Sequence, residues 1–267
     1  MTALRTRRHG LDRLFATSSI LALVMAAPPA HARQEVGGPA PIITSATDAY
    51  GLQAPDAGSA VTSSGDSIYT GVKTNASGTP IQANGTPATN PSQYVSSGAT
   101  GAYALNGGVV WLNVNPSSGA ATGVTGLVTT LGATSDGLRA DGAGSKIAAA
   151  KETIKTSGAG SLGVSALNGG AITLTGSSVT GSGTSATGLG ASGVGSTISA
   201  TQVTVVSTNF DSYGAGAIDS GAIDMLGGSI TSSSSALRVA SNGTITATNV
   251  SLTATASNAI GCSPTGA

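Results

Sequence analysis

Three aspartates late in the chain are the side chains best placed to do chemistry. Asp219 and Asp224 lie within one repeat unit, and Asp211 lies on the segment before them. Cleavage of a glycosidic bond uses carboxyl groups set about 5–10 Å apart, usually with aromatic or cationic side chains that hold the sugar. Only Phe210 and Tyr213 are close in sequence. We therefore expect solvated turn and surface acids, and keep a carbohydrate-active enzyme as the alternative function.

A second candidate is the triplet Gly65-Asp66-Ser67, which matches the short signature around the nucleophile of secreted serine hydrolases. A serine hydroxyl needs a general base to accept its proton, and that base is normally a histidine. The chain has 2 histidines, His9 and His31, and both lie in a segment that we expect to be removed. The triplet is therefore interpreted as a turn leading into an inward-facing Ile68, and no catalytic residue is assigned.

The first 32 residues have the pattern of an export signal. Four arginines precede a mostly apolar stretch, 14–27, which is too short to span a membrane. Ala30-His31-Ala32 fits a small-x-small cleavage site, so residues 1–32 are predicted to be a signal peptide cleaved after Ala32. Thr6-Arg7-Arg8 leaves open whether export follows the general or the twin-arginine route.

Cleavage would leave seven basic and ten acidic side chains and no histidine. This balance provides no basic stripe for nucleic acid or an anionic membrane. The densest basic cluster is Arg139, Lys146, Lys151 and Lys155; it could dock anionic glycans, but isolated surface bases usually form a solvated face. The single Cys262 cannot form an internal disulfide, and without histidine or clustered cysteine we expect no metal site and no cofactor.

An internal repeat explains how a chain with 8% charged and 3% aromatic residues can fold. Five rows carry a turn pair, one further residue and an isoleucine, at spacings of 22 to 26 residues: Ile147, Ile172, Ile198, Ile223 and Ile245. A second apolar residue follows seven positions later in each row: Ile154, Val179, Val205, Ile230 and Leu252. A third precedes the turn pair: Leu138, Val164, Leu189, Ala215 and Leu237, with Ile260 opening a further row. The pattern continues upstream at Val61, Ile68 and Val110.

Alternation within the rows indicates strands. Ile172 and Leu174 alternate with threonines, a period of two. An offset of seven would place Ile172 and Val179 on opposite faces of a straight strand, so a corner at Gly176-Ser177-Ser178 is needed. No unit can bury its apolar face alone, so the units must stack. The predicted fold is all-β, a parallel β-helix of roughly eight rungs of 22–26 residues.

The step from Val110 to Ile147 is 37 residues, about a dozen more than the repeat requires. We expect the surplus to leave the coil as an excursion within 115–135. Trp111, the only tryptophan, lies in a predicted strand where inward-facing Val110 and Leu112 would direct it outward. It is expected to pack beneath the excursion, which needs an apolar anchor, with a role in ligand contact as the alternative.

The export signal, the repeat length and rungs such as SALNGGAITLTGSSVTGSG (165–183) together resemble the passenger domains of bacterial autotransporters, with pertactin-like adhesins as the nearest well-known group. Those passengers are right-handed parallel β-helices. The resemblance covers residues 50–261 and implies secretion across the inner membrane of a Gram-negative cell and display of a rod at its outer surface. It transfers no binding residue. It also implies a C-terminal translocator β-barrel; the chain stops at Ala267 without such strands, so a truncated chain or a stand-alone exported rod is expected.

The predicted organisation is a signal peptide (1–32), an N-terminal linker or cap (33–49), a β-helix passenger (50–261) and a disordered tail (262–267). The expected function is a non-enzymatic, adhesin-like passenger that attaches to glycans or proteins on host or bacterial surfaces. It would lie at the cell surface or outside the cell if a translocator is supplied, and in the periplasm otherwise. The alternatives are an enzyme that uses Asp211, Asp219 and Asp224, and a truncated fragment without function.

Overall fold

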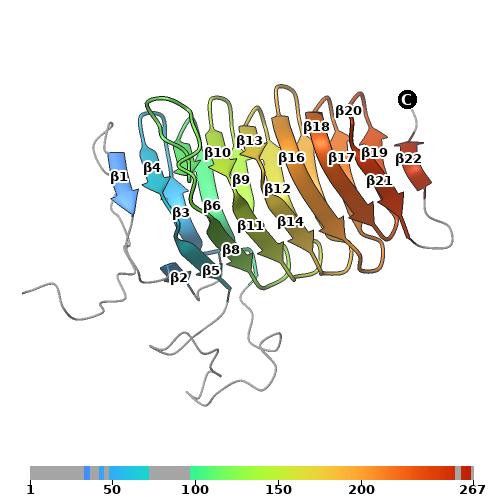
Figure 1. Ribbon diagram of the computed structural model, residues 1–267, viewed down its shortest axis with the longest axis horizontal. Helices are drawn as coiled ribbons and strands as arrows, with labels where there is room; N and C mark the ends of the chain where they lie inside the picture. The colour runs from blue at the N-terminus through green and yellow to red at the C-terminus, as the bar shows by residue number, and fades with distance from the viewer. Residues whose placement is uncertain (1–32, 37–41, 45–47, 72–96, 256–259, 266–267) are drawn as a thin grey trace, which may run out of the picture.

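A computed structural model shows the chain wound into a parallel β-solenoid (Figure 1). It describes residues 33–36, 42–44, 48–71, 97–255 and 260–265. The predicted signal peptide lies outside these ranges. The strands pair in parallel from rung to rung, and no helix occurs among the described residues. The predicted all-β solenoid is therefore confirmed.

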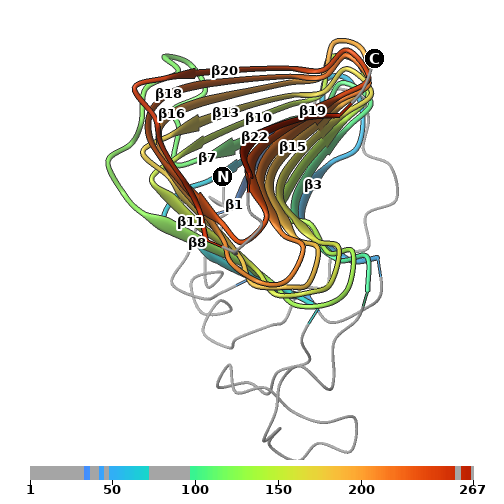
Figure 2. The same ribbon diagram turned by 90° about the vertical axis from the view of Figure 1, so that its right-hand side faces the viewer.

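Each coil contributes to three faces, which Figure 2 shows end-on. The first face contains β1 (Arg33–Val36), β4 (Ala60–Ser63), β7 (Val109–Leu112), β10 (Lys146–Ala150), β13 (Ala171–Thr175), the first halves of β16 (Thr197–Ser207) and β18 (Ala222–Ser232), and β20 (Thr244–Thr248). The second face contains β2 (Ile42–Thr44), β5 (Ser67–Thr70), β8 (Gly126–Thr130), β11 (Glu152–Thr156), β14 (Ser178–Gly181), the second halves of β16 and β18, and β21 (Ser251–Ala254). The third face contains β3 (Tyr50–Ala54), β6 (Thr100–Leu105), β9 (Leu138–Asp141), β12 (Leu162–Leu167), β15 (Thr187–Ser192), β17 (Tyr213–Ile218), β19 (Ser235–Ala240) and β22 (Ile260–Thr265).

The chain completes about five turns without a gap, between β7 and β19. The third face nevertheless stacks eight strands. The number of turns, about five, is smaller than the roughly eight rungs predicted. With neighbouring rungs about 4.8 Å apart, the stack of strands is roughly 35 Å long.

The solenoid pairing extends beyond the predicted passenger boundaries at both ends. β1 and β2 pair with β4 and β5, within the 33–49 segment predicted to be a linker or cap. β22 pairs with β19 as far as Thr265, within the tail expected to be disordered. Cys262 takes the position opposite Leu237 that was assigned to Ile260. An edge rung offers unpaired backbone N–H and C=O groups whatever its side chains, so pairing can outrun the apolar pattern.

The predicted apolar residues, joined by Leu52, Ala102 and Val128, form three columns in the core. The first-face column runs through Val61, Val110, Ile147, Ile172, Ile198, Ile223 and Ile245. The second-face column runs through Ile68, Val128, Ile154, Val179, Val205, Ile230 and Leu252. The third-face column runs through Leu52, Ala102, Leu138, Val164, Leu189, Ala215 and Leu237. Most of these side chains are fully buried, and each buried Val, Ile or Leu contributes about 1.5–3 kcal/mol.

A residue with a left-handed backbone, followed in β18 by a second one at Gly228, bends each coil between the first and second faces. The first left-handed residues of these corners are Gly65, Asn113, Lys151, Gly176, Gln202, Gly227 and Asn249, with φ between 53° and 76°. The bend reverses the alternation of the strand, so that apolar residues seven positions apart both point inward. The corner predicted at Gly176 is therefore confirmed.

A column of glycines on the third face was not singled out by the sequence analysis. It consists of Gly51, Gly101, Gly137, Gly163, Gly188 and Gly214. Each precedes a third-face core residue and lies against a β-branched side chain of the second face. A Cβ on Gly163 would overlap Cγ1 of Val179 and lie 2.7 Å from the carbonyl oxygen of Gly188. The second and third faces lie so close together here that only one of them can carry a side chain.

A column of hydroxyl side chains runs along the second face, at the last residue of each strand. It contains Thr44, Thr70, Thr130, Thr156, Ser207 and Ser232, with Gly181 between the fourth and fifth of these. Oγ1 of Thr130 donates to the carbonyl oxygen of Ser135 at 3.0 Å. Oγ1 of Thr156 is buried and has no hydrogen-bond partner among the described residues. A buried hydroxyl without a partner lowers the stability of the fold.

The glycine column predicts a contrast between two glycine-to-alanine changes. Gly163→Ala should lower the free energy of unfolding by about 1–3 kcal/mol, because the new methyl group meets Val179 and the backbone of the next rung. Gly216→Ala is the matched control on the same face, since its Cβ would meet only Cγ2 of Thr187, at 3.8 Å. Urea unfolding measures both values, and equal effects would contradict a sterically limited interior.

The hydroxyl column predicts opposite effects for two threonine-to-valine changes. Thr156→Val should raise the free energy of unfolding by about 1 kcal/mol, because it removes a buried hydroxyl that has no partner. Thr130→Val should lower it by a similar amount, because it leaves the Ser135 carbonyl without its donor. Thermal unfolding followed by circular dichroism compares the two. A loss of stability in Thr156→Val as large as that in Thr130→Val would contradict the assignment.

Candidate functional site

The three candidate acids are not gathered into one site. Asp211 and Asp219 occupy exposed left-handed turn positions at opposite ends of β17, about 20 Å apart for a strand of this length. That exceeds the separation at which two carboxyl groups act on one glycosidic bond, about 5–10 Å. Asp224 is exposed on the outer side of β18, facing solvent as expected.

The aromatic neighbours of these acids lie at one end only. The hydroxyl of Tyr213 donates to Oδ1 of Asp211 at 3.1 Å. The Tyr213 ring also faces the guanidinium of Arg238, 4.8 Å from its centroid. Phe210 is 78% exposed in the same turn. The possible sugar-holding rings are thus grouped with Asp211 and separated from Asp219 by the length of β17.

The Gly65-Asp66-Ser67 triplet forms the corner between β4 and β5. The carboxylate of Asp66 is buried, and its Oδ2 accepts hydrogen bonds from the Ser63 hydroxyl at 2.6 Å and the Ser64 N–H at 3.2 Å. Ile68 follows and points into the core. The triplet is the turn that the sequence predicted.

The four clustered bases lie on different sides of the solenoid. Arg139 is on the third face, Lys146 on the first and Lys155 on the second, while Lys151 occupies a corner. They form no docking patch for anionic glycans. Lys146, Lys151 and Lys155 are exposed to solvent as expected, but on different sides of the solenoid instead of on one face. One rung winds once around the axis, and bases that are consecutive in sequence are therefore spread around its circumference.

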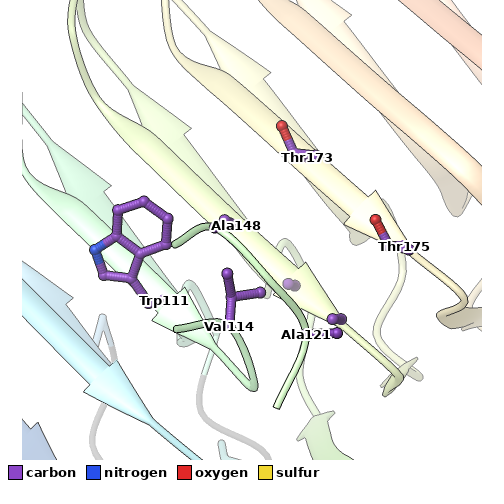
Figure 3. Close-up of a pocket in the computed structure, with 9 residues that line it drawn as sticks. Trp111, Val114, Ala121, Ala148, Thr173 and Thr175 are labelled. Atoms are coloured by element: carbon purple, nitrogen blue, oxygen red, sulfur yellow. The ribbon is translucent and has the colours of Figure 1, made fainter. Parts of the chain in front are cut away.

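Trp111 lies on the outer side of the first face, because Val110 and Leu112 point into the core. Its half-buried indole forms one end of a groove with a volume of about 330 Å³ (Figure 3). Val114 and Ala121 form the adjoining wall. The groove is concave and of the size at which small-ligand sites begin, about 300 Å³.

The remaining surfaces of the groove come from the next two rungs. Ala148 and Ala150 of β10 form the floor, and Thr173 and Thr175 of β13 form the far side. Both threonines are exposed, and Figure 3 shows their hydroxyls on the same side of the strands as the indole. No charged residue lines the groove.

The excursion that forms the wall is a compact loop of residues 115–125, green in Figure 2. Ala121 makes an antiparallel bridge with Val114. The N–H and hydroxyl of Thr122 donate to the carbonyl oxygen of Asn113 at 2.8 and 3.1 Å. The chain rejoins the solenoid at Gly126, so the excursion is shorter than the predicted limit of residue 135. Trp111 lines the same groove as Gly119 and Ala121 of this loop.

Asn113 ties three rungs together at the base of the excursion. Its Oδ1 accepts a hydrogen bond from the N–H of Gly65, one rung back, at 2.6 Å. Its Nδ2 donates to the carbonyl oxygen of Ala150 at 3.2 Å and to Oε1 of Glu152 at 2.7 Å, one rung forward. The loop is therefore rooted in a buried, fully bonded amide.

Glu152 completes this polar corner. Its carboxyl group is 4% exposed and fills the space over Gly126, where a Cβ would overlap it. Oε2 has no hydrogen-bond partner among the described residues. Burial, reinforced by the nearby negative charge of Asp66, raises the pKa of Glu152 to about 8. The carboxyl group is thus protonated at neutral pH.

Arg139 is the centre of a second polar cluster, on the third face. Its guanidinium donates to Asp141 at 2.8 Å, lies 3.9 Å from Asp136 and is 5.6 Å from the centroid of the Tyr103 ring. Burial raises the pKa of Asp136 to about 6, despite a backbone hydrogen bond and the charge of Arg139. Burial would also raise the pKa of Asp141, but hydrogen bonds from Arg139 and Asn168 outweigh it and lower that pKa. Asp141 is thus the closest ion-pair partner of Arg139, whereas Nε of Arg139 is buried without a hydrogen-bond partner among the described residues.

Sequence reasoning missed the roles of Asn113 and Glu152. A signal was present for Glu152, which directly follows the left-handed corner residue Lys151. Aligned rows place Ser177 and Val203 at the same interior position. Continuing the row alignment through the corner would have predicted a carboxyl group inside the solenoid.

Two further features of the described residues concern metal binding and membrane spanning. Within those ranges, no group of three or more His, Cys, Asp and Glu side chains is arranged to hold a metal ion. None of the chain that the structure describes forms a helix of the length and apolar character needed to cross a membrane. The candidate site is the groove beside Trp111, whose lining residues carry no charge.

The raised carboxyl pKa values predict a loss of stability as the pH rises. Glu152, with an ordinary value of 4.5, and Asp136, with 3.8, bind protons more tightly when folded, so unfolding releases protons and stability falls with pH until about 8 and 6 respectively. Glu152→Gln should remove the decline between pH 6 and 8 and stabilise the protein at pH 8 on the order of 3 kcal/mol. Asp136→Asn is the control that should affect only the lower window. Melting temperatures between pH 4 and 9 measure this; an unchanged upper decline in Glu152→Gln would refute the assignment.

No protein-family model, curated protein or solved structure matches this chain. What is established is therefore what the structure itself shows. The chain is a parallel β-solenoid, and its first face carries an uncharged groove between Trp111 and the threonines of β13.

Proposed function

We propose that this chain is a secreted or surface-displayed, adhesin-like protein of the autotransporter-passenger kind, without catalytic activity. The parallel β-solenoid is the observation that carries the proposal. Such a rod places side chains in rows at a constant spacing of about 4.8 Å along its length. Repeated, individually weak contacts along such rows can add up to firm attachment.

The outer surface supports attachment by polar contact. On the first face, Thr173, Thr197, Ser199, Thr244 and Thr246 are polar side chains exposed on three rungs. Their hydroxyls can both donate and accept hydrogen bonds, as glycan and protein surfaces require. The low charge of the sequence leaves hydrogen bonding as the main polar interaction available.

Export is the second element of the proposal and is supported by the sequence of residues 1–32. We propose that cleavage follows Ala32 and that the rod reaches the periplasm, and the cell surface or medium where a translocator acts on it. The absence of an internal disulfide is compatible with this route, because the column of stacked rungs supplies the stability. The separation of Asp211 from Asp219 supports a non-enzymatic role over the carbohydrate-active alternative.

Fractionation of a Gram-negative host expressing the full chain tests the export step. We expect a product with Arg33 at its N-terminus outside the cytoplasm, and a variant lacking residues 2–32 should stay in the cytoplasm. Latex beads coated with the mature protein should then adhere to mammalian or bacterial cells better than beads coated with heat-unfolded protein. Unprocessed chain retained in the cytoplasm, or equal adhesion by both kinds of bead, would contradict the proposal.

A further inference from the structure

The geometry points to the Trp111 groove as a binding site for a neutral oligosaccharide. This inference deepens the proposed function, on which its biological role rests, by naming a site and a ligand class. The site is defined by the indole of Trp111, the alanine floor of β10, and the threonines Thr173 and Thr175 (Figure 3).

The indole supplies a flat apolar surface at one end of the groove. Trp111 faces outward, is half-buried, and shows its ring nearly face-on in Figure 3. Its Nε1 makes no hydrogen bond with any described residue. The face of an aromatic ring carries partial negative charge and attracts polarised C–H bonds, such as the axial C–H groups on the flat side of a pyranose ring.

Two exposed hydroxyls complement the ring across the groove. Thr173 and Thr175 are successive outward residues of β13, about 7 Å apart, and neither hydroxyl has a hydrogen-bond partner among the described residues. Thr173 lies two rungs from Trp111, in register through Ala148. The distance from the indole to the hydroxyls is therefore about 10 Å, which suits more than one sugar ring.

The floor between these groups allows a ligand to lie close to the sheet. Ala148 occupies the register position between Trp111 and Thr173, and Ala150 lies beside it. Larger outward residues there would fill the groove. The alanine methyl groups make only non-directional apolar contacts. The threonine hydroxyls and the indole ring therefore set the orientation of the ligand.

The wall of the groove is held in place before any ligand arrives. Val114 and Ala121 are bridged to each other, and Thr122 is bonded to Asn113, whose amide spans three rungs. A fixed wall lowers the entropy lost on binding. The groove is therefore better suited to a ligand of defined shape than to an adaptable segment of protein chain.

The chemistry of the lining selects the ligand class. No charged side chain lines the groove, so an acidic or basic ligand would lose hydration without gaining a partner. An apolar peptide would leave the free hydroxyls of Thr173 and Thr175 buried without partners. A neutral sugar satisfies both requirements, because one face is rich in C–H groups and its edges carry hydroxyls.

Tryptophan emission, excited selectively over that of the 5 tyrosines, reports on this site alone, because Trp111 is the single tryptophan. The mature protein would be titrated with cellohexaose and N-acetylchitohexaose as neutral probes and with hexagalacturonate as a charged one. We expect at least one neutral probe to shift the emission, with a Kd on the order of 1 mM, and hexagalacturonate to have no effect. Binding of hexagalacturonate as tight as that of the neutral probes would overturn the assignment of ligand class.

Variants distinguish binding in the groove from non-specific binding elsewhere on the protein. The double change Thr173→Val and Thr175→Val should weaken binding about tenfold, since each hydroxyl contributes one hydrogen bond. Thr253→Val, an exposed threonine on the second face, should leave the Kd unchanged. By ligand-detected NMR, Trp111→Ala should abolish binding, whereas Phe210→Ala, which removes an exposed ring elsewhere, should not.

Several results would overturn the inference. These are no emission shift up to the solubility of either neutral probe, equal losses in Thr253→Val and the double variant, or a shift that depends on protein concentration without sugar, which would indicate self-association. The outcome is separable from the proposed function. Export and bead adhesion without oligosaccharide binding would support the adhesin function and overturn the groove as its binding site. Oligosaccharide binding by a chain that is retained in the cytoplasm would support the binding site and contradict the adhesin function.

Discussion

The narrow interior is the constraint on which the rest of the solenoid depends. Rungs stack about 4.8 Å apart, so each inward side chain lies directly between the inward side chains of the rungs above and below. Where the second and third faces converge, a β-branched side chain such as Val179 leaves no room opposite, and Gly163 fills that position without a side chain. The same geometry repeated from Gly51 to Gly214 fixes which face may carry bulk. Strand direction, register and corner positions are then common to all rungs.

The rung repeat was legible in the sequence because its apolar residues recur at constant offsets. Ile172 and Val179 pair in register with Ile198 and Val205, as their alignment predicted. Features that depend on contacts between two faces could not be predicted from the sequence, because the residues in contact lie far apart within a row. The glycine column was overlooked for this reason, although a glycine directly precedes every third-face apolar residue from Leu52 to Ala215 and would have revealed it. The four basic residues are spread over different faces because the chain winds around the solenoid axis, and this cannot be seen from their order in the sequence.

The candidate site was visible only in part. The sequence directed Trp111 outward and placed surplus residues after it, and both features are present. It did not show that the next two rungs contribute a small floor and free hydroxyls, because these residues lie about 37 and 62 positions further on. Nor did it show that Asn113 and Glu152 hold the base of the loop. Side chains that bond across rungs cannot be read from one row of a repeat.

The excursion at 115–125 changes the length of one rung without changing its pairing. Val110 still lies opposite Ile147, and Val128 opposite Ile154, on either side of the insertion. A corner of this solenoid therefore tolerates inserted residues, because each rung contacts only its immediate neighbours. Recognition and scaffold are thereby free to evolve separately. Insertions and deletions at a single corner could reshape the surface beside the groove while the strands that carry it stay in register.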